Sequence, residues 1–145
     1  MGWFRRLMAR LRRREEVQKL EEEERRNFFR YIMETPRIVT WMRREKGISR
    51  KKLELTLIDD EERPAYQIGQ IAELLMKDLN IFYLVTGRED AFEDLVEEAM
   101  EEHGLLLVLL PRTEGQAPGN LILDVGEWEK HLDIISAVSY NTLTM

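Results

Sequence analysis

From Leu53 onward, short apolar runs alternate with longer amphipathic segments, and this alternation constrains the fold more than any other feature of the chain. The runs LELTLID, IFYLV and LLLVLL have the length and apolar content of strands. The segments between them repeat apolar residues at helical spacing and meet helix boundary signals at Pro64, Asp90 and Gly104. Strands separated by helices predict a parallel sheet that is covered on both faces.

The last strand and helix depart from this alternation. The run LILDV follows LLLVLL after PRTEGQAPGN, a segment too short for the usual helical crossover between parallel strands. We therefore expect LILDV to pair antiparallel at one edge, and the chain to close with a helix through Trp128, Leu132, Ile135 and Val138. The predicted fold class is α/β, a small three-layer domain with a mixed, mostly parallel sheet of about four strands in the order β-α-β-α-β-β-α.

The N-terminal segment MGWFRRLMARLRRR predicts a basic amphipathic helix. Its apolar side chains share one stripe at the helical period, namely Trp3, Phe4, Leu7, Met8 and Leu11. Arginines cover the rest of its surface: Arg5, Arg6, Arg10, Arg12, Arg13 and Arg14. We expect the helix to continue through a very polar middle and to end at Thr35-Pro36, because the residue before proline is pushed out of the helical region. A short second helix should begin at Pro36 and close at Gly47.

The net charge of −6 conceals a polarised chain. Residues 1–52 hold 17 of the 22 Lys and Arg and 8 of the 28 Asp and Glu, a net charge of +9, whereas residues 53–145 carry −15. Together with the helix pattern, this asymmetry predicts two parts. They are a basic helical arm, residues 1–48, and an acidic α/β domain, residues 49–145.

Composition excludes several kinds of chemistry. The chain has no cysteine, which rules out disulfides, thiolate catalysis and cysteine-bound zinc. Its longest apolar run, GLLLVLLP, is far shorter than the ~18–20 residues of a membrane span, and arginines interrupt every apolar stretch at the N-terminus, unlike a secretory signal. We therefore expect a cytoplasmic protein. No serine lies in a nucleophile motif, and the histidines lack further ligands at metal-site spacing; we expect His131 on the solvent side of the last helix.

Charged residues follow three of the predicted strands. Asp59 and Asp60 follow the first strand, Arg88 the second and Arg112 the third. Because ligands bind outside the carboxyl ends of strands in open α/β sheets, these four residues form the predicted ligand site, either for Mg²⁺ or for a phosphorylated small molecule. Only Asp124 could complete a set of carboxylates for the ion, although an antiparallel strand would place it away from the others. The structural alternative is a polar turn whose acids are stabilised by the dipole of the following helix.

The stretch LTLIDDEERP, with the apolar helix after it, resembles the opening of a response-regulator receiver domain, in which two acids after the first strand help to hold Mg²⁺. The resemblance covers only this strand and helix. A receiver also needs an aspartate at the end of its third strand to accept phosphate, and LLLVLLPRT has Leu109 and Leu110 there. Its later strands with Thr or Ser and with Lys have no counterpart here. We therefore do not expect a phosphate-accepting receiver.

The basic helix gives the strongest functional prediction. Aromatic residues on one stripe with arginines around them suit a helix lying in a lipid headgroup layer. We expect a non-catalytic interaction module whose helix docks on an anionic membrane surface, on a protein partner or on another copy of the chain; packing on its own domain is the structural alternative. Nucleic acid is not favoured as a partner, because the domain is acidic and no nucleic-acid-binding fold is recognised. The competing prediction is a Mg²⁺-dependent or phospho-ligand-binding protein that uses the strand-end residues.

Overall fold

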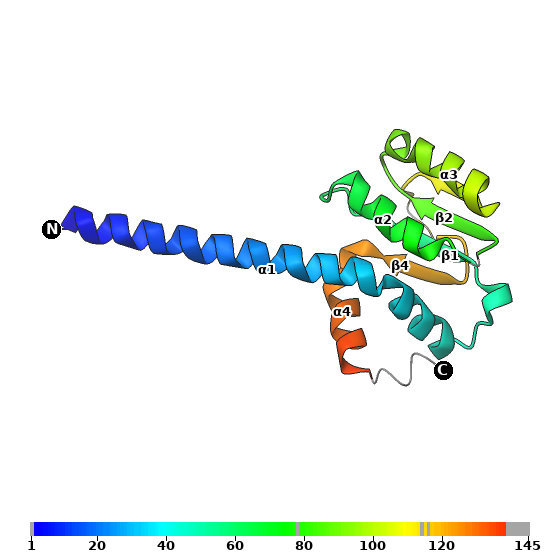
Figure 1. The fold of residues 1–145 in the computed structure, drawn as a ribbon, viewed down its shortest axis with the longest axis horizontal. Coiled ribbons are helices and arrows are strands. Elements are labelled where there is room, and N and C mark those ends of the chain that lie inside the picture. Colours follow the sequence, from blue (N-terminus) through cyan, green and yellow to red (C-terminus); the bar gives the residue numbers. More distant parts are fainter. Residues whose placement is uncertain (1, 78, 114, 116, 139–145) are drawn as a thin grey trace. The chain divides into compact units, whose positions relative to one another are not determined.

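The computed structural model describes residues 2–77, 79–113, 115 and 117–138 (Figure 1). The predicted order β-α-β-α-β-β-α after a long N-terminal helix is confirmed. The helices are α1 (Gly2–Glu45), α2 (Ala65–Leu75), α3 (Glu93–His103) and α4 (Trp128–Ala137), the strands are β1 (Leu55–Ile58), β2 (Ile81–Val85), β3 (Leu106–Leu110) and β4 (Leu121–Asp124), and the short 3₁₀ helices are η1 (Arg50–Lys52), η2 (Glu89–Phe92) and η3 (Val125–Glu127). The chain divides into two compact units, with the boundary between Arg30 and Tyr31, inside α1.

The four strands form one sheet in the order β3-β2-β1-β4, and each neighbouring pair is parallel. The prediction that the last strand pairs antiparallel is therefore wrong: β4 runs parallel to β1, with Leu121 opposite Leu55. The usual crossover contains a helix, but the described residues between β3 and β4 contain none. An extended chain covers about 3.3–3.6 Å per residue. That reach spans three strand spacings of about 4.8 Å and the length of one strand.

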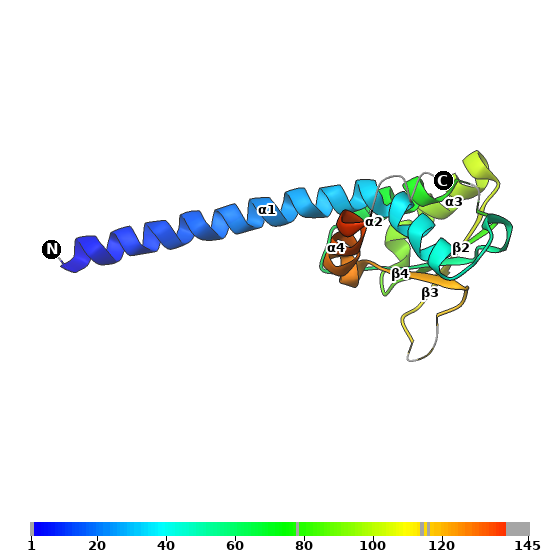
Figure 2. The same cartoon turned by 90° about the horizontal axis from the view of Figure 1, so that it is seen from below.

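The described part of this connection lies on the sheet face opposite α2 and α3 (Figure 2). Its end is fixed to the start of β1, because the Asn120 N–H donates to the Glu54 carbonyl oxygen at 2.9 Å and the Glu54 N–H donates to Asn120 Oδ1 at 2.9 Å. The Thr56 hydroxyl donates to the Pro118 carbonyl oxygen. At Gly119, φ is 86° and a Cβ atom would lie 2.5 Å from the Glu54 oxygen. Only glycine fits this crossing without strain.

The core lies between the helices and one face of the sheet. Side chains from both layers are fully buried there: Leu55, Leu57, Phe82, Leu84, Ile68, Ile71 and Ala99. Alternate strand residues point to the opposite face, where Tyr83 is half-buried and Leu106 is 50% exposed. The α/β fold class is thus confirmed, with helices on one face of a wholly parallel sheet and the described part of the β3–β4 connection on the other.

The prediction that the N-terminal helix ends at Thr35-Pro36 is wrong, because α1 continues to Glu45 with the proline inside it. Proline removes the N–H that would donate to the Ile32 carbonyl oxygen. The Thr35 hydroxyl donates to that oxygen instead, at 2.7 Å. Residues 31–45 therefore form the last part of α1 rather than a separate helix, and they belong to the second compact unit, where Tyr31, Ile32, Ile38 and Val39 are buried.

Helix α4 buries the apolar stripe expected of it, with Trp128, Leu132 and Ile135 inside. The Trp128 and Tyr31 rings lie 6.2 Å apart, which joins α4 to the second part of α1. The prediction that His131 faces solvent is wrong: this residue is only 8% exposed, because it falls on the same stripe at helical spacing. Burial lowers the pKa of His131, although the nearby Glu127 carboxylate opposes the shift.

Candidate functional site

The carboxyl ends of the parallel strands lie along one edge of the sheet, and this edge brings Asp59 and Arg88 into direct contact. The Asp59 side chain is fully buried, and each of its oxygens accepts a hydrogen bond from the Arg88 guanidinium: Nε to Oδ2 at 2.8 Å and Nη2 to Oδ1 at 2.9 Å. The Thr86 hydroxyl also donates to Oδ2, at 2.7 Å. Two of the four predicted ligand residues thus form one bidentate ion pair.

Arg88 is held by more than this carboxylate. Its backbone N–H donates to the Thr86 hydroxyl oxygen at 3.0 Å, and Nη2 donates to the Asp60 carbonyl oxygen at 3.2 Å. The hydrogen bond that Arg88 donates to the Asp59 carboxylate is the largest cause of the raised pKa of Arg88, and burial opposes the shift. A buried carboxylate that loses its partner typically destabilises a protein by about 3–5 kcal/mol. A ligand that drew Arg88 away would have to offset that loss.

Arg112 reaches the same edge from the end of β3. Its Nη2 donates to the Asp59 carbonyl oxygen, and its Nε lies 3.4 Å from Glu61 Oε2. The Glu61 carboxylate occupies the space above Gly87, where it would contact any Cβ atom. Sequence reasoning singled out Arg112 but missed Glu61 as its partner and Thr86 as a donor to Asp59. The pairing of β1 with β2 and of β2 with β3 brings these distant segments together.

The remaining acids close turns. Asp60 Oδ1 accepts from the Glu62 N–H at 3.2 Å, and its Oδ2 lies 3.6 Å from Arg63 Nε. Asp124 Oδ1 accepts from the Gly126 N–H at 2.9 Å. Because β4 is parallel, Asp124 lies at the common edge, contrary to the expectation that it would lie away from it. Across the described ranges, no group of three or more His, Asp and Glu is placed to hold a metal ion.

A cavity of about 330 Å³ adjoins these strand ends. Ile58, Val85 and Leu110 form part of its wall, and Arg112 is the charged side chain among the described residues that line it. Since Arg112 is already paired with Glu61, the cavity offers mainly apolar surface. The contacts at this edge therefore give Asp59, Arg88 and Arg112 a structural role: they join the ends of β1, β2 and β3.

The second group of predicted residues lies in residues 2–14 of α1, here called the contact helix. At 100° per residue, its five apolar side chains span an arc of about 140°. All five are exposed: Trp3 69%, Phe4 50%, Leu7 43%, Met8 36% and Leu11 41%. The Trp3 and Phe4 rings pack edge to face with their centroids 6.1 Å apart. On the same projection, five of the six arginines occupy the remaining arc. Arg14 falls within the apolar arc and ends it, one turn beyond Leu11.

The apolar arc stops after Leu11. A two-stranded coiled coil would continue it every three and four residues, but those positions hold Arg14, Gln18, Glu21 and Arg25. The contact helix has six arginines and no acid, whereas residues 15–26 contain six glutamates and three basic residues. Basic charge and apolar surface therefore coincide in one short segment.

Comparisons with models of known protein families, with curated proteins and with solved structures found no match. Among the described residues, no helix has the length and the apolar content needed to cross a membrane.

Proposed function

We propose that this protein is a non-catalytic interaction module whose contact helix binds an anionic membrane surface. The supporting observation is the division of residues 2–14 into two faces, with exposed Trp3, Phe4 and Leu7 on one and arginines on the other. Helices divided in this way lie in the headgroup layer, with the apolar face toward the acyl chains and the basic face toward lipid phosphates and water.

The expected binding free energy corresponds to a weak, reversible attachment. Each arginine near an anionic leaflet contributes on the order of 1 kcal/mol. The six arginines of the contact helix would give a dissociation constant of roughly 10–100 μM. Burial of the aromatic and aliphatic side chains adds to this attraction. Because the electrostatic part is screened over about 8 Å at physiological ionic strength, added salt should weaken the attachment.

A protein partner or a second copy of the chain would use the same apolar arc. Self-association through a coiled coil is disfavoured by the polar residues that follow Leu11 at the seam positions. A lipid surface needs no shape complementary to so short an arc, and it supplies both the negative charge and the apolar depth that the contact helix presents. These features favour the membrane over the other two partners.

Co-sedimentation with vesicles tests the proposal. The full chain should bind vesicles that contain phosphatidylserine and bind neutral phosphatidylcholine vesicles at least tenfold more weakly. Replacing Arg5 and Arg6 with Gln should weaken binding about 30-fold, since two arginines contribute roughly 2 kcal/mol. Replacing Arg25 and Arg26 with Gln changes the net charge equally outside the contact helix, and it should have little effect.

Equal binding to both kinds of vesicle, or equal losses in the two arginine pairs, would refute a membrane role for this segment. Light scattering without lipid separates the rival partner. If the wild type is a stable oligomer and the variant with Gln at positions 5 and 6 is a monomer, the contact helix serves self-association instead.

A further inference from the structure

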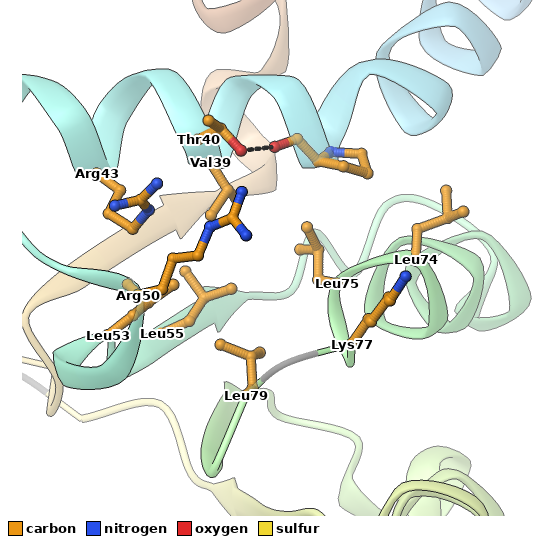
Figure 3. Close-up of a pocket in the computed structure, with 11 residues that line it drawn as sticks. Val39, Thr40, Arg43, Arg50, Leu53, Leu55, Leu74, Leu75, Lys77 and Leu79 are labelled. Carbon is orange, nitrogen blue, oxygen red and sulfur yellow. Dashed lines mark hydrogen bonds between the residues drawn. The ribbon is translucent and has the colours of Figure 1, made fainter. Parts of the chain in front are cut away.

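A second cavity, of about 350 Å³, lies at the opposite end of the body from the strand-end residues, near the start of β1 (Figure 3). Three segments line it: the last part of α1, the η1–β1 segment, and the end of α2 with Lys77 and Leu79 after it. Its volume falls within the range of about 300–1,000 Å³ that is usual for small-molecule sites. It lies wholly within the second compact unit.

One part of the wall is apolar. Leu55 and Leu75 are buried side chains that form its inner surface, and Leu79 and Val39 extend it. Figure 3 shows these side chains directed toward a common space between α1, β1 and the end of α2. An apolar group that entered this space would be removed from water, at a gain of about 25 cal/mol per Å² of buried surface.

The charged side chains among the described residues that line the cavity are all cationic: Arg43, Arg50 and Lys77. Arg50 extends from η1 toward α1, and Lys77 lies on the other side, beside Leu74 (Figure 3). Within the described part of the chain, no carboxylate forms an ion pair with any of these three cations.

The charged form of Arg43 is destabilised by its surroundings. Burial lowers the pKa of Arg43, and the positive charges of Arg50 and Arg44 lower it further. Its position is fixed by a hydrogen bond from Nη1 to the Ile48 carbonyl oxygen at 2.8 Å, which uses one of its five N–H donors. An anion placed between Arg43 and Arg50 would relieve their repulsion and accept charge-assisted hydrogen bonds from both.

We infer that this cavity binds an anionic amphiphile, a molecule with an apolar chain and a carboxylate or phosphate head group. The chain would lie against Leu55, Leu75 and Leu79, and the head group between the cationic side chains. The site was missed because its three cations come from segments that only the fold brings together.

Calorimetric titration of the full chain with soluble eight-carbon probes tests this site. Octyl phosphate or octanoate should bind with one molecule per chain, and octanol and inorganic phosphate should each bind at least tenfold more weakly than the better of those two. Whichever anion binds more tightly identifies the head group. Methyl NMR spectra should show the largest shifts at Leu55, Leu75 and Leu79.

Two variants of η1 make the test specific. Arg50→Gln removes a lining cation and should weaken binding about tenfold or more, as expected for the loss of a hydrogen bond between charged groups. Lys51→Gln removes the same charge from the next residue, which does not line the cavity, and should change affinity less than twofold. Both side chains are exposed, so both variants should fold. Equal affinities of the two variants, or octanol binding as tightly as the anions, would overturn the inference.

Discussion

In an uninterrupted helix, residue 36 would donate to the carbonyl oxygen of Ile32, but Pro36 has no N–H to give. Thr35 is 0% exposed, so water cannot replace the missing donor, and the Thr35 hydroxyl makes the bond at 2.7 Å. One hydroxyl thus removes the penalty of a buried, unsatisfied carbonyl. The rule that a helix ends before proline fails here, because a neighbouring side chain supplies the missing hydrogen-bond donor.

Thr35→Val keeps the shape of the side chain and removes the donor. We expect a loss of about 1–3 kcal/mol in the free energy of unfolding, the usual cost of an unsatisfied buried group, measured by urea denaturation. Thr40→Val is the matched control: the Thr40 hydroxyl donates to the Pro36 oxygen at 2.9 Å, which can also accept the backbone N–H of residue 40. Its loss should be clearly smaller. In a Pro36→Ala background, where an N–H returns, Thr35→Val should cost less; an unchanged cost would contradict this account.

His131 is a buried base with a lowered pKa, and burial is the main cause. It adjoins Ile38, Trp41 and Ile135 between α1 and α4. Below its ordinary pKa of 6.5, the unfolded chain binds a proton that the folded chain does not. The free energy of unfolding must therefore fall as the pH drops below about 6.5, until the lower folded pKa is reached.

His131→Leu should flatten the change in unfolding free energy between pH 7 and pH 5, because the buried titrating group is gone. Urea denaturation at several pH values measures this change. His103→Gln replaces an exposed histidine at the end of α3 and should retain the wild-type pH dependence. If the His131 variant is as sensitive to pH as the wild type, burial of this imidazole does not control acid stability.

The candidate ligand residues show how far sequence reasoning reaches. Parallel strands place their carboxyl ends at one edge, and this rule correctly brought Asp59, Arg88 and Arg112 together. Their pairing could not be derived, because it depends on side-chain directions at the end of each strand. The burial of Asp59 and its bond from Thr86 follow from the same local geometry.

At the level of elements, periodicity identified every strand of the sheet and the helices between them. The predicted antiparallel direction of β4 is wrong, because a short connection does not exclude a parallel strand after it. The described residues of this connection, 111–113, 115 and 117–120, contain no helix, and Gly119 lies against the start of β1 with φ 86°. The length of a connection limits its reach, but it does not fix the direction of the next strand.

Gly119→Ala tests the role of this crossing. A methyl group would be strained at φ 86° and would lie 2.5 Å from the Glu54 oxygen, so we expect a loss of at least about 2 kcal/mol in unfolding free energy. Gly115→Ala is the control in the same connection, since no described atom outside Gly115 and its two chain neighbours lies within 4 Å of its Cβ position. Its effect should be small, within about 1 kcal/mol of the wild type. Equal thermal stability of the two variants would show that the crossing tolerates a side chain.

On the scale of the whole molecule, charge follows the structural division of the chain. Residues 1–30 carry a net charge of +4 and residues 31–145 carry −10. Within the first unit, the basic excess is confined to the contact helix, because the glutamates of residues 15–26 outnumber the basic residues there. Sequence alone placed the end of the basic arm at residue 48; packing assigns residues 31–45 to the second unit, because that part of α1 carries core side chains.

The central claim is that the apolar arc of the contact helix binds an anionic membrane surface, and the most direct test is the partition of two serine variants onto anionic vesicles. Trp3→Ser with Leu7→Ser removes part of the arc, and Val17→Ser with Leu20→Ser removes equally exposed apolar residues outside it. We predict that the first pair lowers the partition coefficient at least about tenfold, as expected for the loss of two inserted side chains, and that the second changes it less than threefold. Equal partition coefficients for both variants and the wild type would contradict the account.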